Sequence, residues 1–282
     1  MVLDERTKSI LDIERVLADL HPISPYGQKL KNELKPYSVS EKKQLTEELD
    51  RVEFLKELVN VQKAVFIEIR SFLRQIKDIR KSVERSISGG VLNLVEFFEL
   101  KNFIYLAKAI SECQKNLQWR IPDKYRINDL QWVEETLDPE KTGIKTFYIY
   151  DCYSEKLKEI RENKSRYEHQ LDILKKQVIK KVESELKVPV RSNGEVTVSK
   201  QRPDIIESLE NYGLLQLMSE TYVNLTYRVK PDEKMLGLMK IIDELKGEEA
   251  LEESRILEEL SERIGKRGAE IIQAMDAIGE FD

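Results

Sequence analysis

The chain has 282 residues, of which 35% are charged, a net charge of −5, and only 8 prolines and 11 glycines. This composition is typical of a helix-rich protein with long exposed faces, and the net charge excludes the overall basic footprint of many nucleic-acid binders. Its two cysteines exclude a disulfide framework, and no stretch approaches the roughly 18 to 20 apolar residues that span a bilayer.

The first segment predicts a helix from Asp4 to Leu20, because apolar residues recur there at helical spacing. This helix ends at His21-Pro22, since proline disfavours the helical conformation of the residue before it. Ser24 then caps a short helix whose first position is Pro25 and which ends near Lys35-Pro36.

Two further helices complete the expected first domain. Ser40 is the expected cap of a long helix that continues, with one apolar stripe, to the flexible run Ser88-Gly89-Gly90. From Val91 to Leu117 apolar residues fill most faces, which predicts a buried central helix. Residues 118–150 indicate loops and short helices, and the β-prone run Thr146–Tyr150 predicts either a short strand or an extended lead into the next element.

Two amphipathic stretches, Ser154–Leu186 and Pro231–Phe281, organise the rest of the chain. In the first, apolar residues at steps of three, four and seven place one stripe on a helix, and Lys and Glu fill its other faces. At 1.5 Å per residue this helix reaches about 50 Å, which is longer than a small domain is wide. We therefore predict an antiparallel helical arm that leaves a body and returns to it. The alternative is a pair of helices within an ordinary globular bundle.

The segment between these stretches has the chemistry of a small β tip. Ser192-Asn193-Gly194 lies between the β-prone runs Val188–Arg191 and Glu195–Ser199, which is the strongest short-range signal for a hairpin. Pro203–Tyr212 predicts a short helix, and Tyr222–Val229 alternates with period two and predicts a third strand.

The expected fold is thus mainly α, a helical core domain with a long antiparallel arm that carries a small β tip. The predicted parts are a helical core over residues 1–150, an outgoing arm helix over 151–186, a small α/β tip over 187–230, and a returning arm helix with the end of the core over 231–282.

A search for catalytic and cofactor motifs finds none. Gly265-Lys266 lacks the earlier glycine of a phosphate-binding loop, where Leu260 stands, and the following Ser or Thr, where Arg267 stands. His21 and His169 do not lie among other ligands at metal-binding spacing. We therefore expect no catalytic residue, metal or cofactor in this chain.

The predicted tip carries a local basic surplus. From Lys175 to Arg202 there are eight Lys and Arg residues and three Glu, a local charge of +5. Neutralised phosphates release counterions, so this surplus indicates contact with a phosphate backbone, and the lack of interleaved aromatics argues against base contacts. The alternative is an ordinary solvated helix face. The expected DNA-backbone-binding residues are Lys180, Lys181, Lys187, Arg191, Lys200 and Arg202.

The order of these segments has a counterpart in a known family. The chain resembles the core (lever) and clamp regions of MutS-family proteins in three successive segments: a long helix that opens near Phe147–Leu157, a β insertion around Val190–Ser199, and a returning helix that ends in Glu258–Asp282. The segment Val91–Phe103 also resembles the core region of that family. The resemblance covers most of the chain and rests on pattern and order. It implies a DNA clamp, a homodimer, and an ATPase domain beyond Asp282 that would bind ATP and Mg²⁺. The family's mismatch-reading domain and Walker ATPase are absent from this sequence.

Two hypotheses for function follow. In the first, the chain is the DNA-binding core and clamp region of a MutS-like mismatch-repair or recombination ATPase, and it relays nucleotide state through its terminal helices without being an enzyme itself. Its partners are then double-stranded or branched DNA, a second copy and the ATPase domain, with no membrane and a cytoplasmic location. In the second, the chain is a coiled-coil scaffold or adaptor that binds a protein partner through its helical arm.

Overall fold

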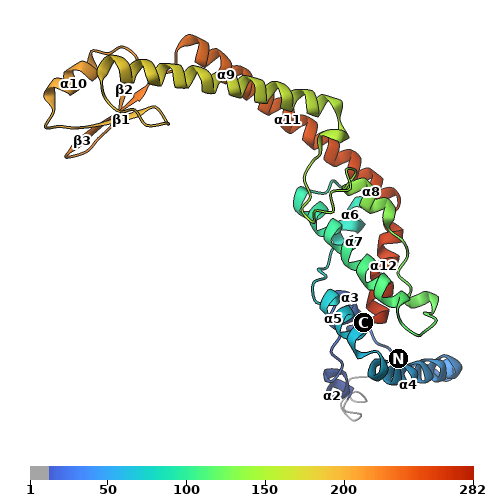
Figure 1. Ribbon diagram of the computed structural model, residues 1–282. Helices are drawn as coiled ribbons and strands as arrows, with labels where there is room; N and C mark the ends of the chain where they lie inside the picture. The colour runs from blue at the N-terminus through green and yellow to red at the C-terminus, as the bar shows by residue number, and fades with distance from the viewer. Residues whose placement is uncertain (1–12) are drawn as a thin grey trace. The chain divides into compact units, whose positions relative to one another are not determined.

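The computed structural model describes residues 13–282, which are mainly helical with a three-stranded antiparallel sheet (Figure 1). The expected fold class, mainly α with a small β tip, is confirmed. The predicted helix Asp4–Leu20 lies partly outside the described residues, and its described part is α2, Ile13–Ala18. The chain forms two compact units. We call residues up to Ile149 together with Ile256–Asp282 the helical unit, and Tyr150–Arg255 the arm unit.

Helix α3, Pro25–Asn32, begins where the sequence predicts. The Ser24 hydroxyl accepts a hydrogen bond from Gly27 N at 3.0 Å, so Ser24 is the N-cap. A carboxylate joins this cap, because Asp282 Oδ2 accepts hydrogen bonds from Ile23 N at 2.8 Å and Ser24 N at 2.7 Å. A Cβ on Gly27 would overlap Asp282 Oδ2, and only glycine therefore permits this approach.

The single long helix expected between Ser40 and Ser88 is wrong. Ser38, rather than Ser40, contacts Glu41 at the start of the region, with Ser38 N donating to Glu41 Oε2 at 2.7 Å. The region forms four elements instead of one: η1 (Val39–Glu41), α4 (Lys42–Val61), α5 (Lys63–Leu73) and α6 (Arg80–Ile87).

Long-range hydrogen bonds account for both breaks in this region. At the first, the Gln62 side chain donates to Asn116 O at 3.1 Å and accepts from Gln118 N at 2.8 Å. At the second, Tyr26 Oη accepts from Ile79 N at 3.3 Å. Since these partners lie far away in the sequence, apolar periodicity does not reveal the breaks.

Helix α7, Leu94–Lys115, is the buried centre of the helical unit, as predicted. Asn93 and Glu96 cap it reciprocally, each side chain accepting a hydrogen bond of 3.0 Å from the other's backbone N–H. Its buried side chains include Phe97, Leu100, Phe103, Ile104 and Ile110. Residues 118–149 contain η2 (Asp123–Tyr125) and α8 (Gln131–Leu137), and the run that begins at Thr146 is an extended lead rather than a strand.

A buried ion pair ties α7 to the loop after α8. Lys101 Nζ lies 3.7 Å from Asp138 Oδ2, and both side chains are 2% exposed. Asp138 also accepts hydrogen bonds from Thr142 N at 3.1 Å, Gly143 N at 2.9 Å and Tyr105 Oη at 3.2 Å. Burial lowers the pKa of Lys101, and burial together with Asp138 raises the pKa of Tyr105 to about 12.

The predicted helix from Pro231 to Phe281 is divided at Arg267 into α11 (Glu233–Lys266) and α12 (Gly268–Phe281). At this break the Arg267 guanidinium lies 4.4 Å from the centre of the Trp132 ring and 2.8 Å from Glu270 Oε1. The break thus has its own side-chain contacts, which local sequence does not signal.

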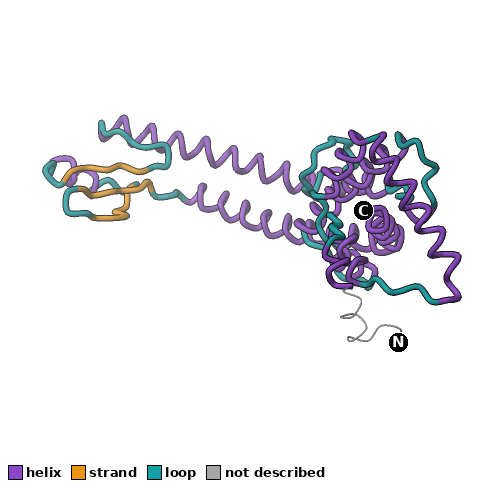
Figure 2. The backbone as a smooth tube through the Cα atoms, turned by 90° about the horizontal axis from the view of Figure 1, so that it is seen from below, coloured by secondary structure: helices purple, strands orange, loops and turns teal. Residues whose placement is uncertain are grey.

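In the arm unit, α9 (Glu155–Leu186) and the first part of α11 lie side by side (Figures 1 and 2). They run antiparallel, as predicted. Arg161 contacts Glu249, and further along α9 Leu171 clusters with Ile242 and Met235. Successive residues of α9 therefore meet earlier and earlier residues of α11. Ser154 caps α9 by accepting a hydrogen bond from Leu157 N at 3.2 Å.

Glu252 of α11 is held at the start of α9. Its side chain is 3% exposed, accepts a hydrogen bond from Ser154 Oγ at 2.7 Å and pairs with Arg255 at 2.5 Å and Lys156 at 3.4 Å. The hydrogen bond from Arg255, followed by that from Ser154, holds the pKa of Glu252 down to about 2.

The sheet has the strand order β1-β3-β2, with β1 at Glu195–Ser199, β2 at Leu215–Glu220 and β3 at Asn224–Val229. The third predicted strand and the predicted helix, α10 (Pro203–Glu210), are confirmed. Strand β2 is a further element that the sequence analysis missed.

The predicted hairpin around Asn193-Gly194 is wrong in its first strand. Val188–Arg191 is not a strand, and β1 pairs with β3 instead. Gly194 N donates to Arg191 O at 2.8 Å, so Asn193-Gly194 forms a local turn. Two features oppose the strand: Pro189 has no N–H to donate, and Val190 N donates to Glu183 Oε1 of α9 at 3.1 Å instead of to a neighbouring strand.

Candidate functional site

The tip, residues 187–230, has one covered sheet face and one open face. The covered face contributes Val196, Val198, Leu225 and Tyr227 to a core completed by Val182 of α9 and Leu209 of α10. Side chains alternate between faces along a strand. The open face, which we call the outer face, therefore carries Glu195, Thr197 and Ser199 of β1 and Asn224, Thr226 and Arg228 of β3.

Lys187 and Arg191 lie where the chain passes from α9 to the sheet. Lys187 ends α9 in the left-handed conformation, with φ 54°, and its N–H donates to Glu183 O at 2.9 Å. Arg191 N donates to Glu195 O at 2.8 Å, which fixes the start of the turn. Both side chains are exposed, and among residues 13–282 no carboxylate lies within ion-pair distance of either. Glu195 is nevertheless near enough that Arg228 first, and Arg191 more weakly, lower the pKa of its carboxyl. These cations are therefore available to an anionic ligand.

Lys180 and Lys181 are exposed on the last turns of α9, and in the described part of the chain neither has an acidic partner. Consecutive residues of a helix point about 100° apart. The two ammonium groups therefore face different sides of α9 and do not form one patch.

Lys200 and Arg202 follow the other end of β1. Lys200 forms an ion pair with Glu220, and Arg202 lies 3.8 Å from Asp204 Oδ2. A five-residue strand such as β1 is about 13 Å long. The six predicted residues therefore divide into unpaired cations near α9 and the start of β1, and partly neutralised cations at the far end of the sheet.

Lys175 and Arg228 line a groove between the two arm helices and the 192–194 turn. The sequence analysis counted Lys175 in the basic surplus but not among the expected binding residues, and it missed Arg228. The groove has a volume of about 550 Å³, and Met235 and Met239 form its apolar side. Arg228 pairs with Glu195, and its hydrogen bond holds the pKa of that carboxyl below the usual value. The period-two pattern of Tyr222–Val229 was the signal that could have placed Arg228 on the outer face.

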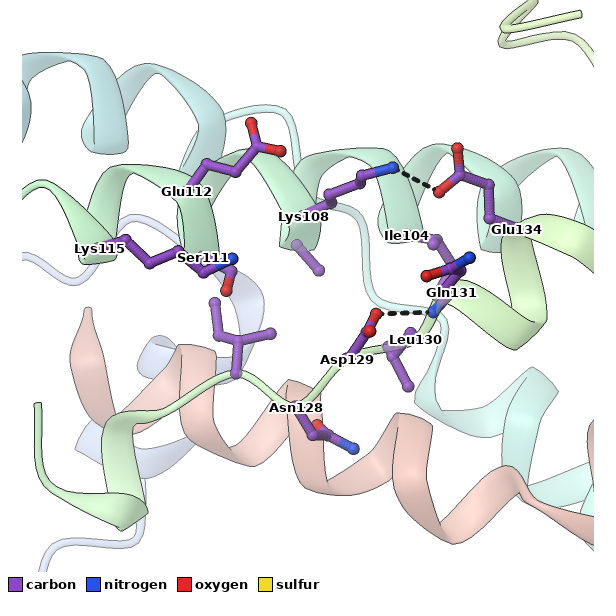
Figure 3. A pocket seen from close by; sticks show the side chains of 12 residues that line it. Ile104, Lys108, Ser111, Glu112, Lys115, Asn128, Asp129, Leu130, Gln131 and Glu134 are labelled. Atoms are coloured by element: carbon purple, nitrogen blue, oxygen red, sulfur yellow. Dashed lines mark hydrogen bonds and ion pairs between the residues drawn. The ribbon is translucent and has the colours of Figure 1, made fainter. Parts of the chain in front are cut away.

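The helical unit has its own surface pocket, of about 280 Å³, between α7 and the segment that leads into α8 (Figure 3). Figure 3 shows Lys108 reaching Glu134, at 2.7 Å, and Asp129 accepting a hydrogen bond from Gln131 N at 2.9 Å. These charged groups already satisfy one another. The pocket therefore offers weaker recognition chemistry than the unpaired cations of the tip.

Outside the tip, the side chains that could ligate a metal or bind a phosphate do not gather into a site among the described residues. Over residues 13–282, no three His, Cys, Asp or Glu side chains come together as metal ligands would. Gly265 closely approaches Ser86 O, so Gly265-Lys266 is a site of helix packing. None of the helices described here has the length and apolar character needed to cross a membrane.

The fold and the tip define a mainly helical protein in which a small antiparallel sheet lies, along the chain, between two antiparallel helices. No protein-family model matches the chain. The chain is similar to the endonuclease MutS2 of Shouchella clausii (strain KSM-K16), with 25% identity over 293 residues that cover 99% of this chain and 35% of the relative. The chain thus spans about a third of the length of that curated relative. This similarity supports a relationship with MutS-type proteins and nothing finer.

Proposed function

We propose that this chain is the DNA-binding lever and clamp region of a MutS-like protein and that its tip grips the backbone of duplex or branched DNA. The observation that carries the proposal is a set of exposed cations for which no carboxylate of the described residues lies within ion-pair distance: Lys180, Lys181, Lys187 and Arg191. Similarity to a MutS2 along 99% of the chain supports the same assignment.

The negative net charge of the chain does not oppose this proposal. At physiological ionic strength, exposed charges more than about 8 Å apart are largely screened from one another. A phosphate near the end of α9 therefore responds chiefly to the charges close to it. The segment Lys175–Arg202 carries +5, whereas the tip as a whole carries +1 because α10 and β2 add acidic residues.

In this proposal the chain binds DNA and performs no chemistry. A second copy of the chain and an ATPase domain with ATP and Mg²⁺ complete the assembly, and α11 and α12 transmit the nucleotide state by moving as packed rigid helices. The endonuclease activity in the name of the relative belongs to that longer protein. Incubation of this chain with plasmid DNA and Mg²⁺ is therefore expected to leave the DNA intact.

The test is fluorescence anisotropy of labelled duplex DNA over a salt series. The variant combines Lys180→Ala, Lys181→Ala, Arg191→Ala and Lys187→Asn, because asparagine tolerates the left-handed conformation at position 187. The logarithm of the DNA-binding constant falls linearly with the logarithm of the salt concentration, and each phosphate contact contributes about −0.9 to that slope. The four changes are therefore expected to make the slope shallower by about three to four units.

The matched control removes the same charge from the helical unit. Lys56, Lys63, Arg74 and Lys115 are exposed there, and their combined change to Ala is expected to leave the slope within about one unit of wild type. The proposal fails if wild type does not bind at low salt, or if both variants weaken binding equally. Either result would favour the scaffold hypothesis, which a pull-down with the intact chain as bait would then test.

A further inference from the structure

The turn between β2 and β3 presents an aromatic side chain almost entirely to solvent. Tyr222 is 97% exposed and its neighbour Val223 is 54% exposed. Leu217 and Met218 of β2, at 49% and 44%, extend this uncovered apolar surface along the sheet edge. Several exposed apolar side chains on one edge strand and its turn are a common feature of binding surfaces.

This turn is held in one conformation by hydrogen bonds. Thr221 N donates to Asn224 O at 2.8 Å, and Asn224 N donates to Thr221 Oγ1 at 2.9 Å. Lys200 N also donates to Val223 O at 2.8 Å, which ties the turn to the end of β1. Since the backbone is ordered before any ligand arrives, binding through Tyr222 costs the rotational freedom of that side chain but little backbone entropy.

The outer face leads from this turn to a cation. Thr197 and Thr226 lie opposite one another on it, with their hydroxyl oxygens 3.4 Å apart, and Ser219 of β2 pairs with Thr226 on the other side. Hydroxyl groups of this kind are common donors to phosphate oxygens. At the far end of β3 stands Arg228, which also engages Glu195, the one carboxylate among the outer-face residues of β1 and β3.

We propose that the outer face binds a DNA strand with unpaired bases, in which Tyr222 stacks on one base while the hydroxyl row and Arg228 contact the phosphates that follow. Stacking on an aromatic ring requires an unstacked base, because the bases of an intact duplex already stack on each other. This inference rests on the proposed DNA-binding function and specifies it, since it assigns a preference for forked or gapped DNA to the β2–β3 turn.

The experiment compares a forked DNA that carries 2-aminopurine in its unpaired arm with a duplex of the same length. Wild type is expected to bind the fork more tightly and to quench 2-aminopurine fluorescence. Tyr222→Ala is expected to lose roughly 5- to 100-fold in affinity for the fork, together with the quenching, while its affinity for the duplex stays the same. Tyr222→Phe keeps the ring and is expected to retain both properties. Tyr37→Ala removes another exposed tyrosine, in the helical unit, and is expected to change neither.

The outcomes separate the two proposals. If Tyr222→Ala keeps the fork preference and the quenching of wild type while the tip cations still govern salt-dependent duplex binding, base stacking is overturned. The clamp function then survives, and the exposed turn is left to a protein partner. If wild type binds neither DNA, both proposals fail. Because the Tyr222 side chain contacts almost nothing in the free protein, an unchanged circular dichroism spectrum is expected for Tyr222→Ala.

Discussion

One charged pair of the helical unit and two cations of the tip lie in opposite environments. In the helical unit, Lys101 and Asp138 are each 2% exposed and engage one another. In the tip, Lys187 and Arg191 are exposed, with no carboxylate partner among the residues that the structure describes. A buried ion pair specifies one arrangement of its surroundings, whereas an unpaired exposed cation adds little to folding and remains available to a ligand. Substitution of Lys101 or Asp138 should therefore change stability, whereas substitution of Lys187 or Arg191 should change binding.

The largest expected effect is on Asp138. Asp138→Ala leaves the Lys101 ammonium buried without its carboxylate, and removing one partner of a buried ion pair costs about 3–5 kcal/mol. Denaturant unfolding would measure this loss in the free energy of unfolding. The Lys187→Asn variant provides the contrast, with an expected change below about 0.5 kcal/mol. Equal losses in the two variants would contradict the comparison.

A change in the tip core should act on the arm unit alone. Leu209 is 1% exposed and packs beneath the sheet, so Leu209→Ala is expected to cost about 2–4 kcal/mol of local stability. Hydrogen exchange would show faster amide exchange in β1 and β3 with unchanged protection in α7. Faster exchange in both units would mean that the two unfold as one cooperative block.

Gly27 tests the contact between α3 and Asp282. Because a Cβ on Gly27 would overlap the Asp282 carboxylate, Gly27→Ala is expected to destabilise the helical unit by about 1–3 kcal/mol. Gly213 has no heavy atom within 4 Å of its would-be Cβ, and Gly213→Ala serves as the control, with a change below about 0.5 kcal/mol. The midpoint of thermal unfolding would report both. A neutral Gly27→Ala would show that α3 and Asp282 separate without cost.

The smallest expected effect is the loss of stability at acidic pH when Glu252 becomes protonated. The pKa of Glu252 is lowered from 4.5 to about 2, so this carboxylate contributes stability above pH 4.5 that is lost as the pH falls towards 2. Its partners Arg255 and Lys156 are 47% and 66% exposed, which limits the contribution to about 1 kcal/mol or less at neutral pH. Glu252→Gln is expected to flatten the dependence of the melting temperature on pH between 4.5 and 2, and an unchanged profile would exclude this role.

Local signals were sufficient wherever an element depends on its own residues. Ser24 and Pro25 mark the start of α3, and the amphipathic stripe after Ser154 marks α9. The errors arose where distant groups decide the outcome. Gln62 interrupts the helix because its side chain meets the end of α7, and Val188–Arg191 stays out of the sheet because Val190 N donates to Glu183 of α9.

In the candidate site too, contacts between distant segments decide what local sequence does not signal. The basic surplus of the tip is visible in the sequence, but strand pairing determines which cations share a surface. Arg228 reaches the outer face through the pairing of β1 with β3, and the exposure of Tyr222 depends on a turn that required β2 to be recognised. The period-two pattern of Tyr222–Val229 could have indicated the face of Arg228, but spacing along the chain gives neither its partner strand nor the exposure of Tyr222.

The bond between Ile23 N and Asp282 Oδ2 joins residues 259 positions apart, and it also sets an order of events during synthesis. The helical unit is discontinuous, because Tyr150–Arg255 lies between its two parts, whereas the arm unit is one unbroken segment. At a translation rate of roughly 5–20 residues per second, the ribosome spends several seconds on the arm unit before α12 emerges. Throughout that interval α3 lacks the carboxylate that completes its cap, so α3 is made before the arm unit but reaches its final packing only after α12 has been made.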